Sequence, residues 1–179
     1  YNQAIARLRS SKEQKEQATI IAHAQQLFQS GEFKACLLYT KNQLLSNRGN
    51  KKLRDIQLDA LGAYKEEVLT SIVTLEAQSQ FFSAAQSVQS FLQFDPRDNE
   101  MQNKLKELRG KAFRKTVANA QAALKAQDLP TLESMVNTLE GLADIDPDVY
   151  ADLKVDLEDL KIQREKERVH QLYLKKDYE

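Results

Sequence analysis

The two histidines are the first candidates for metal or acid–base chemistry. His23 and His170 each fall in a predicted long helix. Two metal ligands on one helix must be three or four residues apart, because those positions share a face. Around His23 none of these positions holds a ligand, and around His170 only Glu167 offers one. One carboxylate beside one histidine does not make a metal site, so we expect packing or surface roles for both.

An acidic cluster near the third loop begins like a calcium-binding loop. Its members are Asp144, Asp146, Asp148 and Asp152, and they lack the glycine and the closing glutamate that such a loop needs at fixed positions. The sequence also contains no Gly-rich phosphate loop, Gly-x-Ser-x-Gly elbow or His-Glu-x-x-His motif. Catalytic carboxylates must be held in a pocket, whereas these fall on predicted solvent faces. We therefore predict that the chain is not an enzyme and uses no cofactor.

The composition favours helices over any other secondary structure. The 179 residues are 41% hydrophobic and 29% charged, with only 3 prolines and 5 glycines, and helix-forming residues dominate. No apolar run approaches the length of about 18 residues that a membrane span needs, so none is expected. The chain starts at Tyr1 rather than at methionine, and we interpret it as an excerpt of a longer protein.

A pattern repeats along the chain about every 48 residues. Four short segments, spaced by 48, 48 and 49 residues, each place a large apolar or aromatic residue after two polar or small ones: Gly31-Glu32-Phe33, Ser79-Gln80-Phe81, Gln127-Asp128-Leu129 and Lys176-Asp177-Tyr178. Apolar positions precede them in the same register, at Leu27, Leu75, Ala123 and Leu172 and at Ala24, Ile72, Ala120 and Val169. Cys36 occupies the position of Ala84 and Leu132, which indicates a small core residue rather than a nucleophile.

Each repeat is predicted to form a long helix, a tight turn, a shorter helix and a loop. Apolar residues three or four apart run through the long helices, and breaks fall at residues 46–50, 94–98 and 144–148. Pro96 and Pro147 fall where a preceding helix must stop, and Asp128 is placed to cap the helix that contains Pro130. We expect units at about 1–49, 50–97 and 98–147, followed by a terminal helix at 148–176.

These units resemble the tetratricopeptide repeat, a helix–turn–helix motif of about 34 residues. The second unit matches best, with Leu75, Ser79-Gln80-Phe81, Ala84, Val88 and Asp95-Pro96 in the family's order. The first unit has Arg48 where the family has proline, and each unit is longer by about 14 residues, close to four helical turns. The resemblance implies an all-α, right-handed solenoid of three stacked hairpins plus a terminal helix, forming one domain over residues 1–179.

The resemblance also implies a partner-binding site on the concave face, which the long helices line. The family's register, anchored at Gly31, places eleven residues there: Gln25, Phe28, Gln29, Glu66, Val73, Glu76, Ala77, Arg114, Gln121, Leu124 and Lys125. A partner helix or extended peptide would lie against them, with Phe28 as the main anchor. We therefore expect a protein–protein interaction or scaffolding module that binds a protein or peptide partner.

The net charge is zero, but the charges are segregated along the chain. Residues 1–54 carry a net +7, residues 55–100 a net −6, residues 101–125 a net +6, residues 126–160 a net −9 and residues 161–179 a net +2. Neighbouring helices of opposite sign attract, and alternating patches can also steer a charged partner or a second copy. Two alternatives stay open: a salt-sensitive self-assembling module that forms homo-oligomers, and a non-catalytic accessory region of a larger enzyme.

The basic residues of 104–115 are the best candidates for a nucleic-acid contact, and they do not line one helix face. Only Phe113 is interleaved among them for base stacking. A protein that grips phosphates usually shows a basic excess, which this chain lacks. We therefore expect no nucleic-acid partner.

Polar stretches at residues 10–17 and 161–168 interrupt the apolar stripes of the first and last helices. Such a helix is exposed on all sides where it has no apolar face. We expect these segments either to project from the body or to meet further repeats, and the first helix is also open to pairing with another chain.

Overall fold

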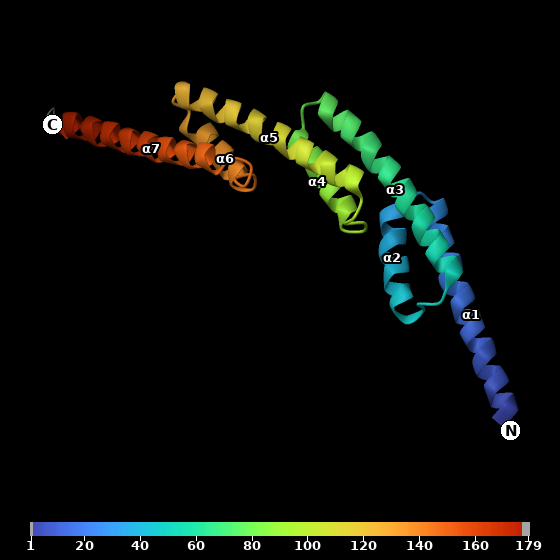
Figure 1. Ribbon diagram of the computed structural model, residues 1–179. Helices are drawn as coiled ribbons and strands as arrows, with labels where there is room; N and C mark the ends of the chain where they lie inside the picture. Colours follow the sequence, from blue (N-terminus) through green and yellow to red (C-terminus); the bar gives the residue numbers. More distant parts are fainter. Residues whose placement is uncertain (1, 177–179) are drawn as a thin grey trace. The chain divides into compact units, whose positions relative to one another are not determined.

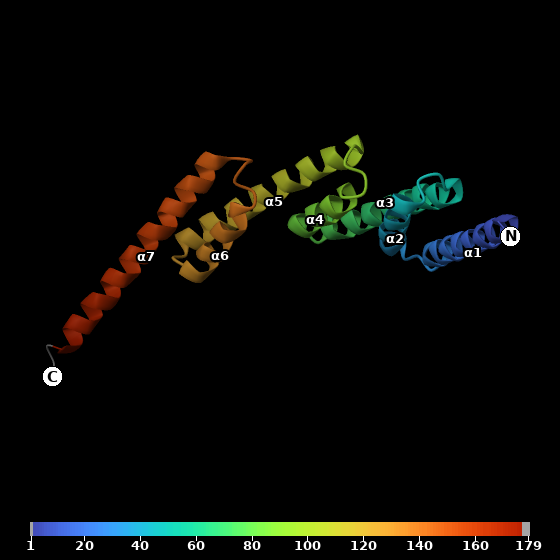
Figure 2. The ribbon, with the colours of Figure 1, turned by 90° about the horizontal axis from the view of Figure 1, so that it is seen from below.

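The computed structural model describes the backbone of residues 2–176 and the side chains of residues 12–174. Over this part of the chain the structure is 85% helical, with seven helices and no strand (Figures 1 and 2). Their bounds are α1 Asn2–Gln29, α2 Phe33–Ser46, α3 Lys51–Ala77, α4 Phe81–Leu92, α5 Asn99–Lys125, α6 Leu129–Glu140 and α7 Pro147–Lys176. The all-α prediction is confirmed.

Long and short helices alternate as the sequence predicts. The long helices α1, α3, α5 and α7 have 28, 27, 27 and 30 residues, and the short helices α2, α4 and α6 have 14, 12 and 12. All three predicted breaks fall between a short helix and the next long one. At about 1.5 Å per residue a long helix spans roughly 40–45 Å.

The turns inside the hairpins repeat with the period of the sequence. Gly31, Ser79 and Gln127 have positive φ angles of 78°, 57° and 53°. In the first turn the amide of Glu32 donates to Leu27 O at 3.0 Å, and in the third the amide of Asp128 donates to Ala123 O at 2.9 Å. These bonds, six residues to one, mark the Schellman ending of a helix. The same chain reversal is therefore made at equivalent positions.

Burial also recurs every 48 residues. Equivalent positions are almost fully buried at Cys36, Ala84 and Leu132, at Thr40, Val88 and Val136, at Ala24, Ile72 and Ala120, and at Leu53 and Met101. Cys36 is 0% exposed, its thiol donates to Ala24 O at 3.4 Å, and burial raises the pKa of this thiol. Cys36 is thus a core residue, as predicted, and the architecture is a helical, repeat-like one.

The chain divides into two compact units, residues 1–78 with 86–102 and residues 79–85 with 103–179. In the first unit α2 packs against both α1 and α3. In the second unit α5, α6 and α7 share one apolar core, to which α6 contributes Leu132, Val136 and Leu139 and α7 contributes Leu153, Leu157 and Leu160. Both views show α5 and α6 side by side. The predicted single repeat domain over residues 1–179 stays a prediction.

Within the first unit, a partly buried charge cluster joins α3 to the start of α5. Lys65 Nζ lies 2.8 Å from Asp98 Oδ2 and 2.6 Å from Glu100 Oε2. Asp98 Oδ1 also accepts a hydrogen bond from the Met101 amide at 3.0 Å, so Asp98 caps α5. Burial opposes ionisation of Asp98, but the bonds from Lys65 and Met101 outweigh it and lower the pKa of Asp98. Hydrogen bonds to Asp98 and Glu100 raise the pKa of Lys65.

In the second unit, basic side chains of α5 and α7 form ion pairs with acidic side chains of α6 and of the loop that follows it. Arg109 of α5 pairs with Asp144, and Lys161 of α7 lies 3.0 Å from Glu133 of α6. Asp128 caps α6 as predicted, because it accepts bonds from the amide of Thr131 at 3.2 Å and from its hydroxyl at 2.7 Å. Exposed pairs of this kind contribute about 0–1 kcal/mol each, so they align the helices more than they stabilise them.

Candidate functional site

The predicted site residues of α1 differ in their exposure to solvent. Gln25 and Gln29 are exposed. Phe28 is half-buried, and its ring centroid lies 5.6 Å from that of Phe33, the first residue of α2. The structure therefore packs the predicted anchor against its own hairpin turn, with only part of the ring free for a partner.

The predicted residues of α3 form a mixed surface. Val73 is 68% exposed, and Glu66 and Ala77 are also exposed. Glu76 is half-buried. Val73 is therefore the largest free apolar side chain among the predicted residues of the first unit.

In the second unit, three predicted residues come together in a hollow between two helices. Gln121, Leu124 and Lys125 of α5 line it, and the opposite wall is formed by Val149, Asp152, Leu153 and Asp156 of α7. Its volume is ≈ 440 Å³, within the range of roughly 300–1,000 Å³ that small-ligand sites occupy. That is room for a few side chains of a peptide rather than for a whole helix. Arg114 is exposed on α5 outside this hollow.

The α7 wall of the hollow was not among the predicted site residues. Val149, Asp152 and Asp156 follow one another at spacings of three and four residues, and Leu153 lies four residues from Val149, so all four share one face of α7. That spacing is visible in the sequence. The register of a long helix alone, however, does not say which face of the following long helix lies opposite, and this is why the second wall was missed.

The hollow has a mixed apolar and charged lining. Leu124, Val149 and Leu153 supply apolar surface, while Lys125 and two aspartates supply opposite charges. No histidine, cysteine or serine lines it. The arrangement can hold an apolar side chain and orient charged groups on either side of it.

The histidines and acidic residues form no metal-binding cluster in the part of the chain that the structure describes. The ring centroid of His23 lies 4.7 Å from that of Tyr39, edge to face, which is a packing role. Among residues 12–174, no three His, Cys, Asp or Glu side chains are grouped so that they could hold a metal ion. No described helix is both long enough and apolar enough to cross a membrane.

Comparison with protein-family models, with curated proteins and with solved structures gives no match to this chain. The class that the structure itself defines is an all-helical protein of repeat-like architecture. Membership of the tetratricopeptide repeat family stays a prediction from the sequence.

Proposed function

We propose that this chain is a tetratricopeptide-like, right-handed solenoid that works as a protein–protein interaction module. The observation that carries the proposal is the hollow between α5 and α7, because three residues predicted to bind a partner line it together. The recurring left-handed turns and buried positions support the repeat on which the register depends.

The ligand that fits this hollow is a short peptide with one apolar side chain and flanking charges. The apolar side chain would contact Leu124 and Leu153. A basic group next to it would face the carboxylates of Asp152 and Asp156, and an acidic group would face Lys125.

The test uses the full chain and a displayed library of random peptides. Peptides selected on the wild-type chain are measured against Asp156→Lys and Lys125→Glu, which reverse charges on the two walls. Each variant is expected to weaken binding by roughly tenfold or more. Lys154→Glu is the matched control, because Lys154 lies two residues from Asp156 but does not line the hollow.

A second arm tests the predicted site residues of the first unit. The double variant Phe28→Ala with Lys125→Glu is expected to bind more weakly than Lys125→Glu alone. Circular dichroism checks that every variant keeps its helical content. If no hollow variant lowers the affinity of any selected peptide, the concave-face site is wrong.

A further inference from the structure

The acidic wall of the hollow occurs twice in the chain, on α3 and on α7. Residues 55–59 of α3 read Asp-Ile-Gln-Leu-Asp, and residues 152–156 of α7, two repeats later, read Asp-Leu-Lys-Val-Asp. The corresponding residues 103–107 of α5 read Asn-Lys-Leu-Lys-Glu, with lysines at the two apolar positions of the motif. The motif of two aspartates with apolar residues between them therefore belongs to α3 and α7 but not to α5.

The two copies of the motif present similar side chains to solvent. Leu58 of α3 is 65% exposed, and its equivalent Val155 of α7 is 61% exposed. Ile56 is half-buried, and its equivalent Leu153 is buried. Among the side chains that the structure describes, none of the four motif aspartates forms an ion pair. Their carboxylates are therefore available to a basic group on a ligand.

The opposite wall of the hollow also has a counterpart, on α1. A shift of two 48-residue repeats maps three residues of α1 onto the three α5 residues that line the hollow: Gln25 onto Gln121, Phe28 onto Leu124 and Gln29 onto Lys125. Exposure agrees at every position, because the first and third residues of each set are exposed and the second is half-buried. The last position differs in charge, since a neutral glutamine stands where α5 has a lysine.

Within the first unit, α1 and α3 lie together as two walls require. The two helices pack against each other, and Nδ2 of Asn50, the cap of α3, donates to Gln17 Oε1 of α1 at 3.5 Å. In the second unit, Arg109 of α5 pairs with Asp144, just before α7 begins. In both units a long helix therefore begins beside an inner turn of the preceding long helix, and the two pairs of walls have corresponding registers.

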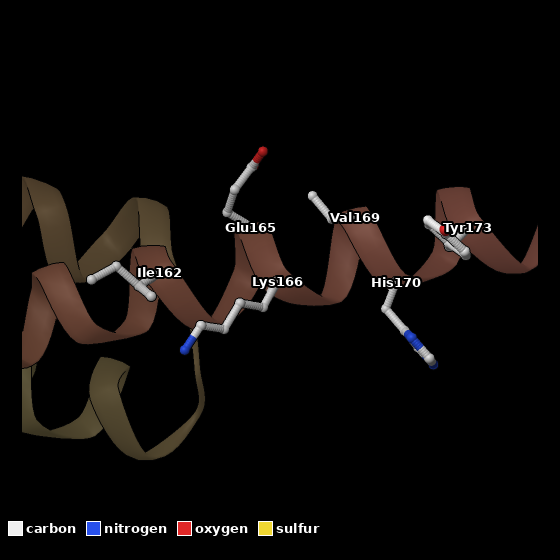
Figure 3. A pocket seen from close by; sticks show the side chains of 6 residues that line it. All are labelled: Ile162, Glu165, Lys166, Val169, His170 and Tyr173. Atoms are coloured by element: carbon white, nitrogen blue, oxygen red, sulfur yellow. The ribbon is translucent and has the colours of Figure 1, made fainter.

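The pocket on the second half of α7 shows what a single helix offers by comparison. All of its lining residues come from α7 (Figure 3): Ile162, Glu165, Lys166, Val169, His170 and Tyr173. A ligand there meets one wall, whereas sites for small ligands enclose most of the ligand's surface. The pair of α1 and α3 is therefore the better counterpart of the hollow.

We propose that α1 and α3 form a second peptide-binding surface, the α1–α3 surface, so that one chain binds two peptides. It consists of Gln25, Phe28, Gln29, Asp55, Ile56 and Asp59. This inference rests on the function proposed for the hollow. The occupant is a peptide with an apolar side chain, which contacts Phe28 and Ile56, beside a basic group that faces Asp55 and Asp59. Because Gln29 replaces the lysine of the hollow, the α1–α3 surface does not select an acidic group.

The probe is a synthetic peptide, blocked at both ends, with one leucine between two arginines and no acidic residue. Isothermal titration calorimetry on the full chain at low salt measures how many peptides bind. The wild-type chain is expected to bind two peptides, and Asp59→Lys and Asp156→Lys are expected to bind one each. The matched control is Glu67→Lys, which makes the same change of charge at an exposed position of α3 outside the surface and should keep both sites.

The outcomes separate this proposal from the hollow. A single bound peptide that Asp156→Lys removes and Asp59→Lys leaves would overturn the α1–α3 surface and keep the hollow. Binding that only Asp59→Lys removes would overturn the hollow and the premise of two sites. No binding to the wild-type chain, or equal binding of a peptide with serine in place of leucine, would overturn both.

A milder substitution checks that the loss in Asp59→Lys comes from the site and not from the fold. Asp59→Asn keeps the size of the side chain and removes only its charge, so it is expected to weaken binding at the α1–α3 surface while leaving the hollow unchanged. Circular dichroism verifies the helical content of each variant. Full binding of two peptides by a folded Asp59→Asn chain would contradict the role of this carboxylate and overturn the proposal.

Discussion

At the residue scale, the left-handed turns of Ser79 and Gln127 store strain that Gly31 avoids. Their φ angles are 57° and 53°, and a residue with a Cβ pays about 1–2 kcal/mol in this region. Glycine loses part of that advantage through its larger entropy in the unfolded chain. The net gain from glycine at either position should still be positive.

Gln127→Gly is therefore expected to raise the free energy of unfolding by about 0.5–1 kcal/mol. Urea denaturation followed by circular dichroism measures this change. Gln121→Gly is the control, because Gln121 lies inside α5, where glycine should lower stability by about 1 kcal/mol. Equal losses in both variants would contradict the assigned backbone of the turn.

The buried hydroxyl of Thr40 is a second case in which the repeat guides a substitution. Thr40 is 0% exposed, and its hydroxyl donates to Cys36 O at 2.8 Å. The equivalent positions hold Val88 and Val136. Thr40→Val is expected to change the free energy of unfolding by less than about 1 kcal/mol, because the carbonyl keeps its helix bond. Thr40→Ala, which leaves a small void, should cost more in the same denaturation experiment.

The sequence predicted where the turns lie but not their conformation at every unit. Glycine at residue 31 predicts a left-handed backbone conformation, whereas serine and glutamine at the equivalent positions do not. Only the 48-residue period identifies Ser79 and Gln127 as turn residues. The type of residue therefore predicted the left-handed conformation at Gly31, whereas the period of the repeat predicted the positions of the other two turns.

At the element scale, Asp98 has two separable roles at the start of α5. It caps the helix through the Met101 amide, and it pairs with Lys65 of α3. Asparagine caps helices about as well as aspartate, so Asp98→Asn removes only the charge. Asp98→Ala removes both interactions and should lower the free energy of unfolding by a further amount of about 1 kcal/mol.

The pH dependence of stability tests the charge of Asp98. Its pKa is lowered in the folded chain, so its contribution is present above the ordinary value of 3.8 and is lost as the pH falls through the folded pKa. The wild-type chain should therefore melt at a higher temperature than Asp98→Asn at pH 6. The difference should shrink as the pH falls from 3.8 and vanish below the folded pKa of Asp98. Parallel melting curves across this range would show that the pair with Lys65 contributes nothing.

The pKa of Lys65 shifts in the opposite direction, so its effect on stability is expected at alkaline pH. Its pKa is raised in the folded chain, so its contribution is present below the ordinary value of 10.5 and is lost as the pH rises through the folded pKa. Melting temperatures on the alkaline side should therefore fall more steeply for the wild-type chain than for Asp98→Asn.

The lengths of the helices were predictable because each apolar stripe ends at a loop signal. The exposure of residues 162–168 agrees with their polar stretch, whereas that of Val169 was not predictable, since Val169 has the same register as the buried Ala120. Periodicity says which face of a helix is apolar. Whether that face is covered depends on a neighbouring helix, which the pattern of one helix does not contain.

At the scale of the whole molecule, the division into two compact units predicts that each unit has its own core and responds separately to damage. Leu132→Ala removes a fully buried side chain from the core of the second unit and is expected to cost about 2–5 kcal/mol there. Hydrogen exchange should speed up in α6 and in the first half of α7, while α2 keeps its protection. Leu37→Ala in the first unit is the reciprocal control, and a uniform loss of protection in either variant would contradict separate cores.

Because Cys36 is the chain's single cysteine, the reactivity of its thiol reports on the opening of the first hairpin. A thiol reacts with aromatic disulfides only as the thiolate and only when solvent reaches it, and the Cys36 thiol is enclosed with a raised pKa. Ellman's reagent should therefore leave the native chain colourless for as long as that hairpin stays shut. The rate at which yellow product forms then counts openings of α1 from α2, with no label introduced.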